Sequence, residues 1–273
     1  MTSRINTVLV IGGTTGIGEQ LVRRFHALGK KVIVTGRNRT SLTALAQDLS
    51  GLETRQFDIT DFSTLPSHAA DILKAFPDLD TVLINAGIQK SFSFFDPSSI
   101  APGEVEREIA ANLTAPTLLI QSFAPHLLAL ATKGNSVTLF VTSSTLGLIP
   151  MGLWPNYSAT KAGVHALALT LRQQIAFAGE EAKKNFNVVE IVPPYVDTGL
   201  DKEHREATNA AQGEHAFPPM PLQDYVDQFF KTLEDAEADG SLKKEIGVGT
   251  GALAVQTWRD SFGEVYKQFG MTT

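Results

Sequence analysis

Short apolar runs alternate along the chain with stretches in which apolar residues recur at helical spacing. Leu21, Val22, Phe25 and Leu28, for example, share one face of a helix expected after the apolar run 7–11. Further helices are expected at about 42–49, 62–76, 105–130 and 157–178. The expected strands are 7–11, 31–35, 53–57, 81–84, 136–142, 187–192 and 245–248. This alternation predicts a repeated strand–helix unit.

Most of the expected strands are apolar throughout, which is typical of a parallel sheet covered by helices on both faces. We therefore predict an α/β chain with a doubly wound parallel sheet of the Rossmann type, in a single domain over residues 1–273. Residues 200–221 depart from this order, because they are polar and then proline-rich. A segment of this length is often a mobile lid over the substrate, although a surface insertion without function has the same pattern.

The composition fits a globular protein and argues against several other classes. The chain is 43% hydrophobic and 19% charged, and its net charge of −6 is unlike the basic surface of most nucleic-acid-binding proteins. No apolar run approaches the roughly 18 residues that cross a bilayer, and the first strand leaves no room for a signal peptide. With no cysteine, thiolate catalysis and disulfides are excluded. We expect a cytoplasmic protein with no membrane or nucleic-acid partner.

A glycine-rich turn, Gly-Gly-Thr-Thr-Gly-Ile-Gly, lies at residues 12–18 between the first expected strand and helix. Glycines allow a sharp turn and close approach to a ligand. The N–H groups at the start of the helix suit a pyrophosphate. The spacing of Gly12, Gly16 and Gly18 differs from the common Gly-x-Gly-x-x-Gly fingerprint, and such a turn can also serve close packing alone. Its place after the first strand favours dinucleotide binding.

Ser144, Tyr157 and Lys161 have a spacing that suits proton transfer. Tyr157 and Lys161 are four residues apart and would lie one turn apart on the same helix face. A tyrosine has a pKa near 10, and bringing it to about 7 requires about 4 kcal/mol of preferential stabilisation of the phenolate. A nearby ammonium can supply part of that. The pair alone proves little, because solvated helices carry Tyr and Lys at this spacing by chance.

Six motifs, in the order typical of one enzyme family, make the chain resemble a single-domain short-chain dehydrogenase/reductase. The family patterns are Thr-Gly-x-x-x-Gly-Ile-Gly, Asn-Ala-Gly, a helix asparagine, a serine, Tyr-x-x-x-Lys and Pro-Gly-x-Val-x-Thr. The matches are residues 11–18, 85–87, Asn112, Ser144, 157–161 and 193–198. Ile11 replaces the usual threonine and Pro194 the usual glycine. Residues 85–89 and those around Pro193 also resemble a subgroup of DltE-type oxidoreductases.

The resemblance implies a role for each of the four catalytic candidates. Tyr157 would be the general acid/base, and Lys161 would lower its pKa and hydrogen-bond the nicotinamide ribose. Ser144 would hold the substrate oxygen, and Asn112 would position a water that relays protons to Lys161. An asparagine at a helical position can also bond only the backbone. Ser143 competes with Ser144, but we predict Ser144 because it precedes Tyr157 by the customary 13 residues.

The end of the second strand bears on the choice between NADP(H) and NAD(H). It carries Arg37 and no carboxylate, so a 2′-phosphate is favoured over a free ribose and NADP(H) over NAD(H). Thr15 stands where NADP-preferring relatives often carry a second basic residue. Arg37 and Arg39 could instead be solvated charges at a helix start.

Further cofactor contacts follow from the resemblance. Asp58 would accept from the adenine amino group with Ile59 nearby, unless it only caps the next helix. Residues 85–87 would line the adenosine ribose, and Val196 and Thr198 the carboxamide and phosphates. The full set implied is Gly12, Thr14, Thr15, Gly16, Ile17, Gly18, Arg37, Asp58, Ile59, Asn85, Ala86, Gly87, Tyr157, Lys161, Pro193, Val196 and Thr198.

The expected substrate is an apolar ketone or secondary alcohol. Apolar residues lie between Ser144 and Tyr157, where a pocket wall is expected, although core packing could claim several: Leu146, Leu148, Met151, Leu153 and Trp154. Phe92, Phe94 and Phe95 could line the substrate site or the core. His204 and His215 in the expected lid could touch substrate, whereas His165 is expected to pack. No cluster has metal-ligand spacing.

These observations predict an NADP(H)-dependent oxidoreductase that transfers a hydride between nicotinamide and a ketone or secondary alcohol. One alternative is a sensor or scaffold protein that binds dinucleotide without turnover. An epimerase or dehydratase is disfavoured by the glycine spacing and by the lack of a sizeable C-terminal domain. By resemblance, we expect a homodimer or homotetramer formed through the helices that carry Asn112 and Tyr157.

Overall fold

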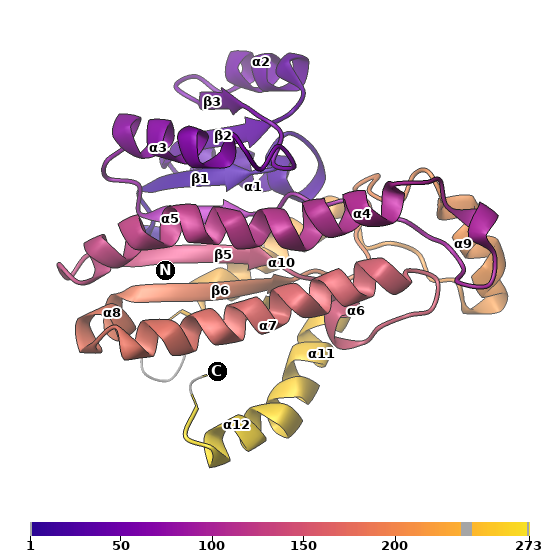
Figure 1. Cartoon of the computed structure of the whole chain (residues 1–273). Helices are drawn as coiled ribbons and strands as arrows, with labels where there is room; N and C mark the ends of the chain where they lie inside the picture. The colour runs from indigo at the N-terminus through magenta and orange to yellow at the C-terminus, as the bar shows by residue number, and fades with distance from the viewer. Residues whose placement is uncertain (1, 236–241, 272) are drawn as a thin grey trace.

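Seven parallel strands form one sheet in the order β3-β2-β1-β4-β5-β6-β7 (Figure 1). The structure is a computed structural model that describes residues 2–235, 242–271 and 273. The strands are β1 Thr7–Ile11, β2 Lys31–Gly36, β3 Glu53–Gln56, β4 Thr81–Ile84, β5 Val137–Thr142, β6 Phe186–Val192 and β7 Glu245–Gly247. Each was expected, and β1 and β4 have the expected bounds. The prediction of a doubly wound parallel sheet in a single domain is confirmed.

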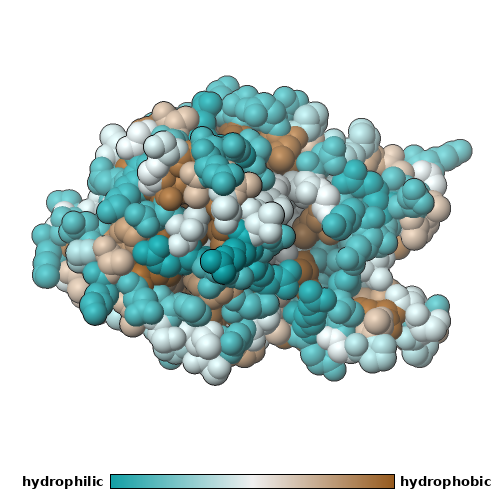
Figure 2. Space-filling model, turned by 90° about the horizontal axis from the view of Figure 1, so that it is seen from above, coloured by the Kyte–Doolittle hydropathy of each residue, from teal (hydrophilic) through white to brown (hydrophobic). Residues whose placement is uncertain are grey.

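Helices cover both faces of the sheet, which explains why its strands are apolar on both sides. Leu9 and Ile11 of β1 face one core together with α3, α5, α7 and α8. Val8 and Val10 face the other core with α1, α2 and α10. The face seen from above is mostly hydrophilic, with hydrophobic residues in small separate patches (Figure 2). On this face, the apolar residues that build the two cores are largely covered.

The helices follow the predicted pattern with a few differences. The third helix begins at Leu65 rather than at residue 62, because Pro66 suits only the first turn of a helix. The expected ranges do not include α6, α8 and α9, nor the later helices α10, α11 and α12. The helices are α1 Gly16–Ala27, α2 Arg39–Asp48, α3 Leu65–Ala75, α4 Glu104–Ile109, α5 Ala115–Ala131, α6 Thr145–Leu148, α7 Pro155–Phe177, α8 Glu180–Asn185, α9 Arg205–Gln212, α10 Leu222–Glu234, α11 Thr250–Trp258 and α12 Glu264–Gln268.

The longest continuous helical stretch runs from Glu104 to Ala131. It consists of α4, a π-helical turn at Ala110–Thr114, and α5. By length and composition alone this stretch of 28 residues could cross a membrane, although no single apolar run suggested it. Core helices meet the same criterion, and here Leu119, Phe123 and Leu127 are buried in the core under the sheet.

The carboxyl ends of the strands meet at one edge of the sheet, where α4, α6 and α9 gather on the right of Figure 1. The connection after β1 leads to β2 on one side, and the neighbour of β1 on the other side is β4. The strand order thus reverses at β1. In an open α/β sheet, this switch point is where ligands bind.

Candidate active site

The glycine-rich turn joins β1 to α1 at the carboxyl edge and has no room for a side chain at its glycines. A Cβ at Gly12 would lie 2.6 Å from the backbone of Ala86, and one at Gly18 would lie 2.1 Å from the Gly12 carbonyl oxygen. Gly12 and Gly16 also have φ of +80° and +55°, which other residues rarely adopt. Thr15, at the helix N-cap, makes no side-chain capping bond. The first N–H groups of α1 therefore lack an acceptor within the helix and fit an anionic pyrophosphate.

Thr14 and Ile17 support this turn from the protein side. The methyl group of Thr14 packs against Gly36 at the end of β2. A Cβ added at Gly36 would lie 2.5 Å from this methyl group. Ile17 is partly buried against the core on the α1 side of the sheet. Thr15, in contrast, is exposed. Of the three, Thr15 is the side chain open to a ligand.

Asn85 ties the turn to the neighbouring strands. Its Nδ2 donates to the Gly12 carbonyl oxygen at 3.3 Å, and its Oδ1 accepts from Thr142 Oγ1 at 3.3 Å. The backbone N–H groups of Asn85 and Ala86 both donate to Ile11. Because the Asn85 side chain is engaged in this way, a ligand contact in this stretch would come from the backbone of Ala86 and Gly87.

The segment after β6 lies against the glycine-rich turn. Thr198 is so close that a Cβ at Gly16 would lie 3.0 Å from the Thr198 Cβ. The Pro193 carbonyl accepts from the backbone and the hydroxyl of Thr145, each at 3.0 Å. Val196 is buried and pairs with Met220 in an isolated bridge. This segment thus joins the turn to the strand end that carries Ser144.

Arg37 and Asp58 lie together beyond the ends of β2 and β3. Arg37 Nη1 is 3.6 Å from Asp58 Oδ2, and both side chains are substantially exposed. Asp58 Oδ1 also accepts from the backbone and hydroxyl of Thr60 at 2.8 and 2.7 Å. Burial acts to raise the pKa of Asp58, but the Thr60 bonds and the Arg37 charge outweigh it and lower that pKa. Ile59, next in sequence, is part of the core.

Tyr157 and Ser144 meet at the end of β5. Tyr157 is 6% exposed and lies beside Ser144, whose side chain acts to lower the pKa of the phenol. Ser144 also caps α6 by accepting from Leu146 N at 3.1 Å. Ser143 points elsewhere, since its hydroxyl donates to Glu190. Of the two serines, only Ser144 is therefore oriented toward Tyr157.

The pKa of Tyr157 is raised rather than lowered in this structure. Burial is the main cause of the raised pKa and the Glu108 carboxylate adds to it, whereas the side chain of Ser144 acts to lower the pKa. The lysine effect expected from the spacing is not among these causes. Lys161 Nζ lies 5.6 Å from the centre of the Tyr157 ring, over its face. The phenol is thus held neutral, which is the form that donates a proton.

Lys161 is buried one helical turn after Tyr157. Its Nζ donates to the carbonyl oxygen of Thr142 at 2.8 Å. Burial lowers the pKa of Lys161 to about 8, although the carboxylates of Glu108 and Glu190 act to raise it. A buried lysine with a pKa this close to neutrality is typical of a functional site.

Asn112 lies in the π-helical turn between α4 and α5 and is fully buried. Its Oδ1 accepts from Ile88 N at 2.9 Å, and its Nδ2 donates to Ile88 O at 2.8 Å. A Cβ at Gly87 would lie 3.1 Å from Asn112 Oδ1 and 3.5 Å from Lys161 Nζ. Asn112 is therefore next to Lys161 in space, and its amide also fixes the loop after β4.

Two buried carboxylates that belong to none of the sequence motifs act on the pKa of Lys161. Glu108 is fully buried and accepts from Lys90 N at 2.8 Å and Asn156 Nδ2 at 2.9 Å. Burial raises the pKa of Glu108. Glu190 lies in the middle of β6 and is also fully buried. Glu190 could have been found from the sequence, because it is a charged residue in an expected strand that consists mostly of apolar residues.

The segment 200–221 contacts residues near the site through His204 and Glu203. His204 Nε2 is 3.1 Å from Trp154 Nε1, which donates, and 3.3 Å from Gln89 Oε1. Glu203 forms an ion pair with Lys90 at 2.7 Å. His204 thus belongs to the boundary of the site, whereas His215 is exposed.

The predicted substrate walls are only partly as expected. The apolar residues between Ser144 and Tyr157 are half-buried: Leu146, Leu148, Met151, Leu153 and Trp154. Phe94 and Phe95 are 76% and 99% exposed, so the alternative that they pack in the core is wrong. His165 packs, as expected, and also contacts Glu190. Across the described part of the chain, no group of three or more His, Asp or Glu side chains could hold a metal ion.

Comparison with known proteins agrees with this geometry. Residues 6–209 match the short chain dehydrogenase family. A relative from Bacillus subtilis (strain 168), the uncharacterized oxidoreductase DltE, is 33% identical over 86% of this chain and 86% of its own length. The mouse dehydrogenase/reductase SDR family member 7B is 32% identical over 71% of this chain, which spans 58% of that protein.

Two solved structures share the fold. A short chain dehydrogenase/reductase from Burkholderia phymatum in complex with NAD superposes with a TM-score of 0.75 at 17% identity, covering 96% of this chain and 95% of that one. A 3-ketoacyl-(acyl-carrier-protein) reductase from Brucella melitensis complexed with NADH gives a TM-score of 0.67 at 22% identity, over 81% and 88% of the two chains.

Proposed function

Because the chain belongs to the short-chain dehydrogenase family, we propose that it is an NADP(H)-dependent oxidoreductase that interconverts a ketone and a secondary alcohol. The observation that carries this proposal is the buried Tyr157 phenol beside the buried Ser144, with Lys161 Nζ over its ring. A neutral phenol beside a second hydroxyl suits a carbonyl oxygen that must receive a proton.

In the proposed reduction, Ser144 and Tyr157 bind the substrate carbonyl oxygen and Tyr157 gives it a proton. When bound, the nicotinamide supplies the hydride. The Lys161 ammonium stabilises the phenolate that remains, because opposite charges interact strongly in a buried site. Asn112, next to Lys161, orients the path by which a proton returns to Tyr157.

The residues at the carboxyl edge fit a dinucleotide. The turn at residues 12–18 offers backbone N–H groups without side chains in the way. Thr198 lies over Gly16 and would contact the phosphates, while Asp58 and Ile59 would hold the adenine. Arg37 is exposed enough to bind a 2′-phosphate, which supports NADP(H) over NAD(H).

We further propose that the substrate is apolar and that residues 200–221 close over it. The half-buried residues from Leu146 to Trp154 supply an apolar wall next to Ser144. The Trp154–His204 hydrogen bond and the Lys90–Glu203 ion pair would hold the lid in place. Protection of this segment from proteolysis on addition of NADPH and substrate tests the lid, and unchanged cleavage would count against it.

We also propose a homodimer or homotetramer through the face formed by α4, α5 and α7, which lie side by side in Figure 1. The apolar composition of the stretch from Glu104 to Ala131 supports a subunit contact there. Light scattering on the purified protein measures the association state directly.

The test of the proposed reaction is NADPH consumption against a panel of apolar ketones, with wild type and Tyr157→Phe. We expect kcat to fall about 1,000-fold in the variant, because a positioned general acid contributes about 100- to 10,000-fold. The melting temperature and the Kd for NADPH should be nearly unchanged. Equal rates in both proteins would contradict the role of Tyr157.

One alternative function belongs to another class, a protein that binds dinucleotide without turnover. The intact set of Ser144, Tyr157 and Lys161 in one buried site argues against it. It would gain support if NADPH bound tightly while no ketone in the panel was reduced.

A further inference from the structure

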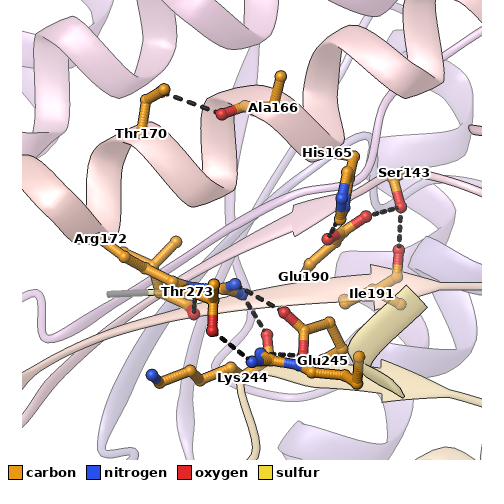
Figure 3. Close-up of polar contacts among 12 residues, drawn as sticks. Ser143, His165, Ala166, Thr170, Arg172, Glu190, Ile191, Lys244, Glu245 and Thr273 are labelled. Atoms are coloured by element: carbon orange, nitrogen blue, oxygen red, sulfur yellow. Dashed lines mark hydrogen bonds and ion pairs between the residues drawn. The ribbon is translucent and has the colours of Figure 1, made fainter. Parts of the chain in front are cut away.

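Glu190 is a fully buried carboxylate in the middle of β6, between β5 and β7. It has contacts on both sides, as Figure 3 shows. Its Oε1 accepts from the Ser143 hydroxyl, and its Oε2 lies 2.8 Å from Nδ1 of His165. A buried carboxylate is costly unless its charge and lone pairs are compensated. The other buried residues of β6 are apolar, so the presence of Glu190 among them calls for a reason.

The two partners of Glu190 are neighbours of the catalytic candidates. Ser143 precedes Ser144 at the end of β5, and its backbone N–H donates to Ile191 O at 2.9 Å. His165 follows Lys161 by one turn on α7. One carboxylate thus connects the strand end that presents Ser144 with the helix that presents Tyr157 and Lys161.

A second buried carboxylate nearby shows what a purely structural arrangement looks like. Glu245 of β7 is paired in register with Glu190 and is 8% exposed. Its carboxylate is bound by the guanidinium of Arg172 at 2.6 Å (Figure 3) and by that of Arg259 at 2.8 Å. Among the residues that the structure describes, Glu190 contacts no guanidinium, and its hydrogen-bond partners are a hydroxyl and an imidazole.

His165 is itself incompletely bonded. Among the described residues its Nε2 has no hydrogen-bond partner, and its ring lies edge-on to Trp258 with centroids 4.8 Å apart. Glu108 and Glu190 are the carboxylates that act to raise the pKa of Lys161, which lies one turn before His165 on α7.

We propose that Glu190 is a positioning residue, which joins Ser143 on β5 to His165 on α7 and so fixes Ser144 relative to Tyr157 and Lys161. The inference rests on the proposed function, because it assigns Glu190 a part in the same proton transfer. It does not require Glu190 to touch substrate or cofactor. Its charge would also help keep the Lys161 ammonium protonated, together with Glu108.

The test compares Glu190→Gln with Glu245→Gln, two isosteric changes of buried carboxylates on adjacent strands. For Glu190→Gln we expect kcat to fall about 10- to 100-fold with KM for NADPH unchanged, as for a slightly misplaced catalytic group. The alkaline limb of kcat/KM should move about one pH unit lower. Glu245→Gln should lower the melting temperature and leave both kinetic properties unchanged. Equal kinetics in the two variants would show that Glu190 is only structural.

A second measurement does not depend on turnover. With lysines labelled at Cε with ¹³C and the Lys161 signal assigned from Lys161→Arg, NMR titration reports the pKa of Lys161 directly. We expect this pKa to fall by about one unit in Glu190→Gln and to stay in place in Glu245→Gln. This shift without turnover on any ketone would overturn the proposed reaction, and with it the part of Glu190 in proton transfer, while still showing that Glu190 acts on the pKa of Lys161. Turnover without the shift and without a loss of kcat would overturn the inference alone.

Ser143→Ala covers the case in which Glu190→Gln does not fold. This substitution removes the hydrogen bond from Ser143 to Glu190 and leaves the Glu190 carboxylate in place. We expect a several-fold lower kcat with an unchanged pKa of Lys161, because only the positioning of Ser144 is lost. Wild-type kcat in Ser143→Ala would contradict the proposed connection.

Discussion

The glycine-rich turn and the Tyr157–Lys161 helix meet at the same edge of the sheet but are built by opposite means. The turn at residues 12–18 contains no titratable group. Its shape requires glycine, because a Cβ added at Gly12 or Gly18 would overlap backbone atoms. The helix site consists of buried ionisable groups, with Tyr157 and Lys161 close to Glu108 and Glu190. The first region should therefore respond to added volume, and the second to charge and pH.

Among substitutions on the dinucleotide side, the largest effect is expected from Gly18→Ala. An added Cβ would lie 2.1 Å from the Gly12 carbonyl oxygen, so the turn must open. Forced overpacking usually costs about 1–3 kcal/mol. If opening the turn weakens the binding free energy of NADPH by about 2.7 kcal/mol, the Kd for NADPH rises about 100-fold. Titration of NADPH fluorescence measures it, and the rise should be the same at pH 7 and pH 9.

Gly29→Ala is the matched control for that substitution. Gly29 has φ of +72° but nothing within 4 Å of an added Cβ, and it lies after α1, at the opposite end of that helix. The left-handed conformation costs alanine about 1 kcal/mol, which lowers the melting temperature by a few degrees. The Kd for NADPH should not change. Equal Kd values in both variants would mean that the turn does not bind the dinucleotide.

Arg37→Asp should have the next largest effect. A charge-assisted bond to a phosphate contributes about 1.5–3 kcal/mol, so the ratio of kcat/KM for NADPH over NADH should fall about 30-fold. Because Arg37 is more than half exposed, the effect should weaken at high salt. Arg39→Asp is the control, since Arg39 is exposed at the start of α2. If both substitutions leave the ratio unchanged, Arg37 does not read the 2′-phosphate.

The sequence predicts the fold and the position of the glycine-rich turn well because local signals determine both. Apolar runs give the strands, and β1 and β4 match residue for residue. The glycine spacing identifies the turn because only glycine fits there. The short helices α6 and α9 were missed because four to eight residues without an apolar period give no helical signal.

The catalytic side is less predictable because its properties depend on partners that are distant in sequence. The spacing of Tyr157 and Lys161 suggested a lowered pKa for the phenol, but burial raises it. Glu108 and Glu190 approach Lys161 from α4 and β6, and neither lies in a motif. The choice of Ser144 over Ser143 rested on an interval, while the physical reason is that Ser143 bonds Glu190.

The smallest and most diagnostic effect concerns pH on the helix side. Burial lowers the pKa of Lys161 to about 8, so its ammonium loses its proton as the pH rises through that value. The charged form is the one that stabilises the phenolate of Tyr157. We therefore expect kcat/KM for ketone reduction to be level below about pH 8 and to fall about tenfold per unit above it. A pH profile with one ketone from the panel measures this limb.

Unfolding would not explain such a fall. Between about 8 and 10.5 the unfolded chain keeps the Lys161 proton that the folded chain has lost, so the lysine's own contribution to the free energy of unfolding rises with pH. Lys161→Arg is the control, because a guanidinium keeps its charge throughout this range. Its rate should be lower but level from pH 7 to pH 9.5. If the arginine variant keeps the same alkaline limb, another group titrates, and the contrast between the two regions loses its electrostatic basis.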